Sequence, residues 1–83
     1  MVIFMITARQ IRAARALLGW SQQELADKAI VSTNAVTRLE RGEVDPRVST
    51  IMAVQKALSE AGVEFIPADE RKGEGARMSK PDA

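Results

Sequence analysis

The apolar positions of this chain follow a helical period over most of its length. Apolar residues recur at intervals of three and four in four segments, at about 8–18, 22–28, 33–41 and 49–61. This spacing places them on one face of a helix, which predicts four amphipathic helices. From 63 to 66 the period shortens to two, which is typical of a strand. The pattern therefore predicts a helical bundle that ends in a short strand.

Polar residues and glycines mark the ends of the predicted helices. Thr7 with Gln10, and Ser21 with Glu24, have the spacing of capping boxes at the first two helix starts. Helices often stop at a glycine in the left-handed conformation. The glycines placed for this role are Gly19, Gly42 and Gly62. The second and third helices are short and separated by only three or four residues, which predicts a helix-turn-helix.

The predicted strand 63–66 needs a partner, because a lone strand leaves its backbone edges unsatisfied. Three partners are open: residues 76–78 of the same chain, the same strand of a second chain, or residues 2–4. Residues 1–4 are themselves either a short strand or an artefact of the gene start. We favour a hairpin that also forms a dimer with the end of the last helix, over a monomeric hairpin packed on its own core. The dimer contacts expected on this strand are Val63, Phe65 and Ile66.

Composition excludes most enzyme chemistry. The chain has 83 residues, enough for one small domain, and contains neither cysteine nor histidine. Disulfides, thiol catalysis and cysteine-ligated metals are therefore ruled out, and the commonest general base and metal ligand is missing. We expect no catalytic residues, no metal and no cofactor.

Charge and hydropathy give weaker indications. Residues 1–62 hold eight Lys/Arg and six Asp/Glu, so a modest positive balance permits contact with phosphates. The apolar run 1–6 is far shorter than the roughly 20 residues that span a bilayer. It also lacks the basic flank and cleavage site of a signal peptide. We therefore expect a cytoplasmic protein without a membrane segment.

The third predicted helix has a polar face suited to a DNA groove. The major groove is about 12 Å wide and admits one helix, whose N-terminal residues reach the base edges. The hydrogen-bonding residues on this face are Ser32, Thr33, Asn34, Thr37 and Arg38. The alternative is a helical hairpin whose outer face is only solvated.

Residues 11–58 resemble the Cro and phage-repressor type of helix-turn-helix domain, the XRE family. The matching segments, in the family's order and spacing, are Ile11–Arg15, Gly19–Gln22, Glu24–Ala26, Val31–Ser32, Val36–Gly42, Pro46 and Ile51. The resemblance implies an all-α, lambda-repressor-like bundle of four helices. The short C-terminal strand or hairpin would replace the usual fifth helix.

The resemblance also implies roles for individual residues. Gln22 would contact a phosphate and support the third helix, and Arg41 would grip phosphate. Physical chemistry agrees for Gln22, because a helix N-terminus favours an anion. Asn34 can pair with adenine, and Arg38 can contact either guanine or phosphate. A largely buried ion pair between Arg15 and Glu40 would fix the tilt of the third helix; the alternative is two solvated charges.

One residue departs from the family pattern. Ile30 stands in the turn before the third helix, where the family usually has glycine. Glycine suits a left-handed conformation and a β-branched residue does not. Either Ile30 is strained, or the turn differs and re-aims the third helix.

The sequence thus predicts a sequence-specific DNA-binding regulator, a repressor that occupies a near-palindromic operator as a homodimer. Residues 7–62 would form the DNA-binding domain, 63–78 the dimerisation element and 79–83 a disordered tail. Two alternatives stay open. One is an antitoxin whose residues 69–83 bind a toxin, and the other is a helical interaction module that does not bind DNA.

Overall fold

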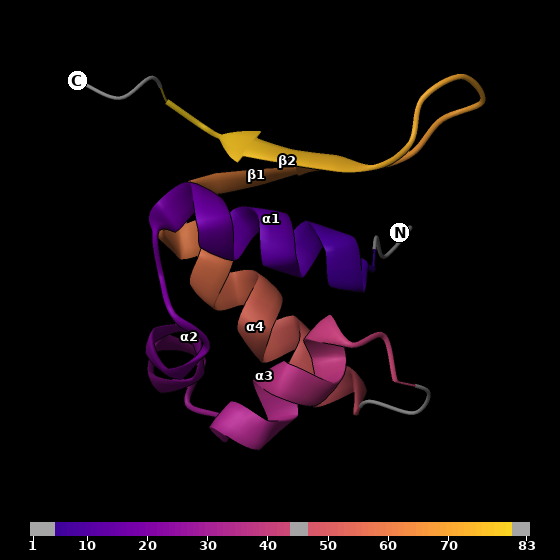
Figure 1. Ribbon diagram of the computed structural model, residues 1–83. Coiled ribbons are helices and arrows are strands. Elements are labelled where there is room, and N and C mark those ends of the chain that lie inside the picture. Colours follow the sequence, from indigo (N-terminus) through magenta and orange to yellow (C-terminus); the bar gives the residue numbers. More distant parts are fainter. Residues whose placement is uncertain (1–4, 44–46, 81–83) are drawn as a thin grey trace.

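The computed structural model describes residues 5–43 and 47–80. Over these residues the chain forms four helices and one antiparallel hairpin, which confirms the predicted bundle with a C-terminal hairpin (Figure 1). The elements are α1 (Ala8–Leu18), α2 (Gln22–Ala29), α3 (Thr33–Glu40), α4 (Val48–Glu60), β1 (Val63–Ile66) and β2 (Gly75–Met78). The expectations for residues 1–4, for Pro46 and for residues 81–83 lie outside the described part of the chain.

The helix starts follow from local capping chemistry. At both predicted capping boxes, the Thr7 and Ser21 hydroxyls accept a backbone N–H while the Gln10 and Glu24 side chains bond back. Gly19 ends α1 in the left-handed conformation, with φ 70°. The boundaries of the other helices differ from the prediction by one residue.

The start of α4 shows why one boundary was wrong. The prediction began this helix at about Ser49. The structure instead begins α4 at Val48, with Arg47 as an N-cap that makes no side-chain capping bond. The helix is therefore held by its buried face rather than by its cap, and cap chemistry gave no signal for it.

All four helices bury one apolar face in a common core. The hairpin lies over α1 at one end of the molecule, while α2 and α3 form the opposite end (Figure 1). The buried apolar residues of the helices are Ile11, Ala14, Leu25, Ala26, Ala29, Val36, Leu39, Ile51, Val54, Ala57 and Leu58. The helical period read from the sequence therefore selected the core-facing positions.

The hairpin pairs β1 with β2 of the same chain. Its register joins Val63 with Met78 and Phe65 with Ala76. Val63 is only 4% exposed in the chain's own core, and Phe65 and Ala76 pack against that core. Of the three strand residues expected at a dimer interface, only Ile66 is classed as exposed.

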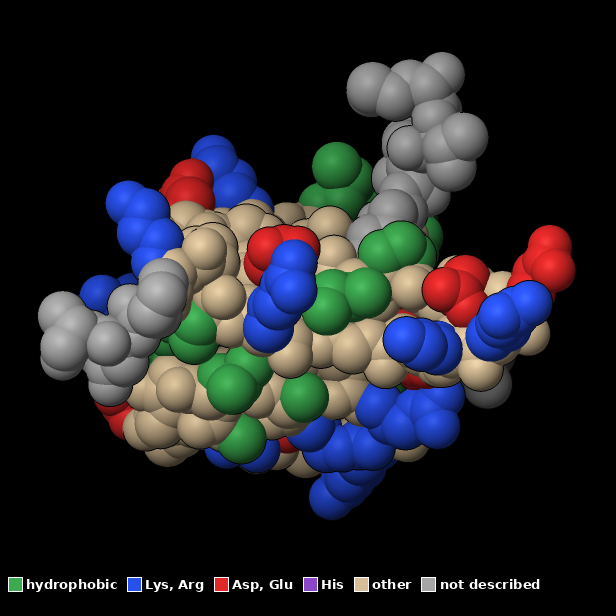
Figure 2. Space-filling view, turned by 90° about the horizontal axis from the view of Figure 1, so that it is seen from above, with side chains coloured by type: hydrophobic (Ala, Val, Ile, Leu, Met, Phe, Trp, Pro, Cys, Tyr) green, Lys and Arg blue, Asp and Glu red, His purple; other side chains and the backbone are tan. Residues whose placement is uncertain are grey.

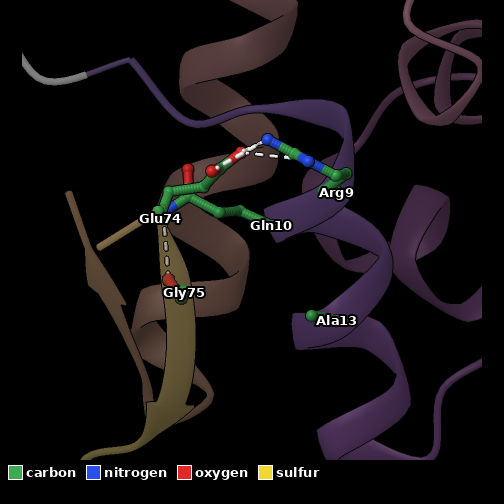
Figure 3. Close-up of a pocket in the computed structure, with 6 residues that line it drawn as sticks. Arg9, Gln10, Ala13, Glu74 and Gly75 are labelled. Carbon is green, nitrogen blue, oxygen red and sulfur yellow. Dashed lines mark hydrogen bonds and ion pairs between the residues drawn. The ribbon is translucent and has the colours of Figure 1, made fainter. Parts of the chain in front are cut away.

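Two side chains fasten the hairpin to the N-terminal turn of α1 (Figure 3). The Gln10 side chain is buried; its Nε2 donates to the carbonyls of Ile66 (3.0 Å) and Gly75 (2.9 Å), and its Oε1 accepts the Thr7 amide (2.9 Å). Beside it, the Glu74 carboxylate accepts hydrogen bonds from Arg9 Nη2 (2.8 and 3.0 Å), from Arg9 Nε (3.1 Å) and from the Thr7 hydroxyl (2.9 Å). The hairpin is thus fixed to α1 by hydrogen bonds as well as by apolar packing.

Candidate nucleic-acid interface

The turn between α2 and α3 is made by a strained residue. Ile30 is the left-handed cap of α2, with φ 57° and ψ 50°. Its amide still donates to the Asp27 carbonyl, and the Val31 amide donates to the Ala26 carbonyl. The turn therefore adopts at Ile30 the left-handed conformation that suits glycine. The sequence left open whether Ile30 is strained or the turn has another shape. The structure shows that Ile30 is strained.

A buried ion pair holds α3 against α1. Arg15 Nε lies 2.8 Å from Glu40 Oε2, and Arg15 Nη2 lies 3.0 Å from Oε1, so the contact is bidentate. The Glu40 side chain is 4% exposed and that of Arg15 26%. The hydrogen bond to Glu40 raises the pKa of Arg15 above its ordinary value, so the guanidinium stays charged. A charge pair removed from water in this geometry stays satisfied only while both partners are present.

Gln22 extends this pair toward the exposed side of α3. Its Nε2 donates to Glu40 Oε1 at 3.1 Å, and its Oε1 accepts the Thr37 hydroxyl at 2.9 Å. Both ends of the Gln22 amide are thus engaged within the protein. The side chain thus joins the start of α2 to the middle of α3. Its expected contact with a phosphate stays a prediction.

The residues expected to face a groove fall into two groups. The Thr33 hydroxyl donates to Gln23 Oε1 at 2.7 Å, and the Thr37 hydroxyl is held by Gln22, so both are half-buried and positioned. Ser32 and Asn34 are exposed at the start of α3, as is Arg38 one turn further on. The Ser32 hydroxyl caps α3 by accepting the Ala35 amide. Exposed polar side chains therefore occur at the start of α3 and again one turn further along it.

Three residues contribute to this site without having been predicted. Gln23 binds Thr33 and, through Nε2, Asp27. Arg12 of α1 donates to the Glu40 carbonyl at the end of α3. Glu43 contacts both Arg38 and Arg41. Their only signal in the sequence is that they are polar residues in or beside the helices, and many solvated side chains share that property.

Two other features are absent from the described part of the chain. Within residues 5–43 and 47–80, His, Cys, Asp and Glu nowhere form a group of three that could hold a metal ion. In the same residues, no helix has the length and apolar character needed to cross a membrane.

Comparison with known families agrees with this geometry. The chain matches the family model described as Helix-turn-helix over residues 11–64, which is more than half of its length. The match begins within α1 and extends through α2, the turn, α3 and α4 into β1. No curated protein matches the chain.

Proposed function

Since this chain belongs to the helix-turn-helix family of XRE-type DNA-binding regulators, we propose that it is a sequence-specific repressor that inserts α3 into the major groove of double-stranded DNA. The family is one of regulatory proteins and not of enzymes. We also place the protein in the cytoplasm, a location that fits a DNA-binding regulator.

The observation that carries the proposal is the contrast between the two sides of α3. The inner side is fixed by Val36, Leu39 and the buried Glu40. The outer side presents exposed Asn34 and Arg38, whose side chains suit adenine and guanine. Because α3 is held rigidly on its inner side, it loses little conformational entropy when its polar outer side enters a groove. Ser32, Thr33 and Thr37 complete the groove-facing set, and Gln22 and Arg41 lie at the two ends where phosphates would pass.

We further propose that two chains form a C₂ dimer through the hairpin. The face seen from above carries hydrophobic side chains among charged ones (Figure 2). Ile66 and Met78 are each 37% exposed in the hairpin, and Leu17 of α1 is 47% exposed. Each strand of a two-stranded sheet also has one edge that the other strand does not pair. A C₂ dimer places its two recognition helices about 34 Å apart, which requires a near-palindromic operator.

The antitoxin alternative has less support. It requires residues 69–83 to be available for a toxin. Glu74 is instead bound to Arg9, and the Ser79 amide donates to the Gly62 carbonyl at 2.7 Å. A segment fastened at these points would have to be released before it could wrap around another protein.

Selection of bound duplexes from random DNA tests the proposal directly. We expect a near-palindromic motif whose half-sites lie about one helical turn apart, and an affinity that falls steeply as salt is raised. The DNA-binding proposal is wrong if no motif is selected and binding does not depend on salt. That result would favour a helical interaction module. A motif consisting of a single half-site would refute the dimer alone.

Two variants separate base reading from phosphate contact. Asn34→Ala should relax base preference at one position of each half-site and leave the salt dependence unchanged. Arg41→Ala should weaken binding to all sequences alike and reduce the salt slope by about one. The orientation of α3 proposed here is wrong if Asn34→Ala leaves the selected motif intact.

A further inference from the structure

Glu43 is held in place by the end of α3. The Gly42 amide donates to the Leu39 carbonyl, and the Glu43 amide donates to the Arg38 carbonyl at 3.3 Å. These two bonds, with Gly42 at φ 70°, form a Schellman motif. The backbone of Glu43 is therefore fixed beside the last turn of α3, although the residue lies beyond the helix.

The Glu43 carboxylate contacts two cations of the proposed DNA surface. Its Oε1 lies 3.2 Å from Arg38 Nε, and its Oε2 lies 3.8 Å from Arg41 Nη1. All three side chains are well exposed, so these pairs contribute little to folding stability. Glu43 lies between two proposed DNA contacts and adds little stability. Its main physical effect is therefore to repel the DNA phosphates that approach these arginines.

The contact between Glu43 and Arg38 engages only part of the Arg38 guanidinium. Within residues 5–43 and 47–80, the guanidinium of Arg38 forms a hydrogen bond through Nε alone. Its terminal Nη1 and Nη2 groups make no hydrogen bond within the same residues and stay available as donors. Two parallel donors of this kind match O6 and N7 of guanine. Glu43 therefore limits the conformations of Arg38 while leaving it able to read a base.

We propose that Glu43 is a specificity-determining residue, which positions Arg38 to read guanine and opposes contact of Arg38 and Arg41 with phosphate. The inference rests on the proposed DNA binding. Non-specific binding depends on phosphate contacts, so a carboxylate beside these arginines weakens it. Glu43 repels the phosphates of the operator as well. In operator binding, however, the contact between the positioned Arg38 and guanine offsets part of this repulsion.

Glu43→Gln tests the proposal, with Glu70→Gln as a matched control. Both variants remove one negative charge, but Glu70 lies in the exposed hairpin loop, at the opposite end of the molecule from α3 (Figure 1). Fluorescence anisotropy would give the affinity of each protein for the operator selected by the wild type and for a scrambled duplex. Selection with Arg38→Ala identifies the guanine that Arg38 reads, since its preference should disappear.

We expect Glu43→Gln to bind scrambled DNA about fivefold more tightly while its operator affinity changes about twofold or less. Its preference at the guanine identified with Arg38→Ala should relax, and other positions should not change. Glu70→Gln should change both affinities equally and only slightly, because salt screens a distant charge.

The inference is overturned if Glu43→Gln raises both affinities by the same factor with unchanged base preference, or if it behaves like Glu70→Gln. It is also overturned if Arg38→Ala loses no guanine preference. Each of these results leaves DNA binding intact. If the wild type binds no DNA in a salt-dependent manner, the proposed function fails and the role of Glu43 fails with it.

Discussion

Replacing Ile30 with glycine should stabilise the protein. Ile30 has φ 57° and is 90% exposed, so its side chain contributes almost no burial while its backbone occupies the left-handed region. That region costs an L-residue roughly 1–2 kcal/mol because Cβ crowds the carbonyl oxygen, and glycine has no Cβ. The substitution therefore removes strain and sacrifices no packing.

The expected gain is smaller than the strain itself. Glycine makes the unfolded chain more flexible, which offsets about 0.4–1 kcal/mol. The net stabilisation by Ile30→Gly is then about 0.5–1 kcal/mol. For a domain of this size that corresponds to a rise in melting temperature of roughly 2–8 °C. Ile30→Asn should give part of the gain, because asparagine tolerates the left-handed region better than isoleucine does.

Thermal and urea unfolding followed by circular dichroism would measure the effect. All proteins must be compared at one concentration, because a dimer unfolds in a concentration-dependent manner. Val48→Gly is the matched control: Val48 is also β-branched and exposed, but lies in the right-handed first turn of α4. It should lose roughly 0.5 kcal/mol. If Ile30→Gly is no more stable than the wild type, strain at Ile30 is not a cost to this fold.

The remaining predictions concern buried or bridging polar side chains. Glu40→Ala should lower the free energy of unfolding by about 3 kcal/mol, because Arg15 loses its partner, and should also weaken DNA binding. Chemical denaturation and fluorescence anisotropy would show whether the two effects occur together. Gln10→Ala should cost about 2–3 kcal/mol, because two carbonyls and one amide lose their bonds; faster hydrogen exchange confined to the hairpin would identify its origin. The Glu74 amide, the Thr7 hydroxyl and Arg9 lower the pKa of Glu74, so its stabilisation is present above the ordinary carboxyl pKa and is lost on acidification. Wild type should accordingly lose more stability than Glu74→Gln between about pH 6 and about pH 3, and parallel curves would contradict this.

Local sequence was sufficient to predict the helices, apart from the start of α4. The capping boxes at Thr7 and Ser21 involve residues only three positions apart, so their geometry follows from the sequence nearby. The same is true of Gly19, which needs only a left-handed backbone. The strand 63–66 also followed from alternation, and its need for a partner followed from its unsatisfied edges. Which partner it takes did not follow, since residues 76–78 were one of three candidates left open.

Contacts between distant residues could not be predicted from the pattern. Gln10 was assigned its capping role, but nothing near it in the sequence indicates that Nε2 reaches the carbonyls of Ile66 and Gly75. Arg15 and Glu40 are 25 residues apart, and only the family resemblance suggested that they meet. Glu43 was missed because its place beside Arg38 depends on the left-handed turn at Gly42, which had been read only as a helix stop.

The arrangement of these contacts makes α1 the link between the two ends of the molecule. Gln10 at its start binds the hairpin, while Arg12 and Arg15 further along bind the carbonyl and the carboxylate of Glu40. A helix is stiff over this distance, so the hairpin and α3 cannot shift independently while these bonds persist. If the hairpin forms the dimer interface as proposed, α1 then sets the separation of the two recognition helices. Half-site spacing would thus be determined by side chains that touch neither DNA nor the second chain.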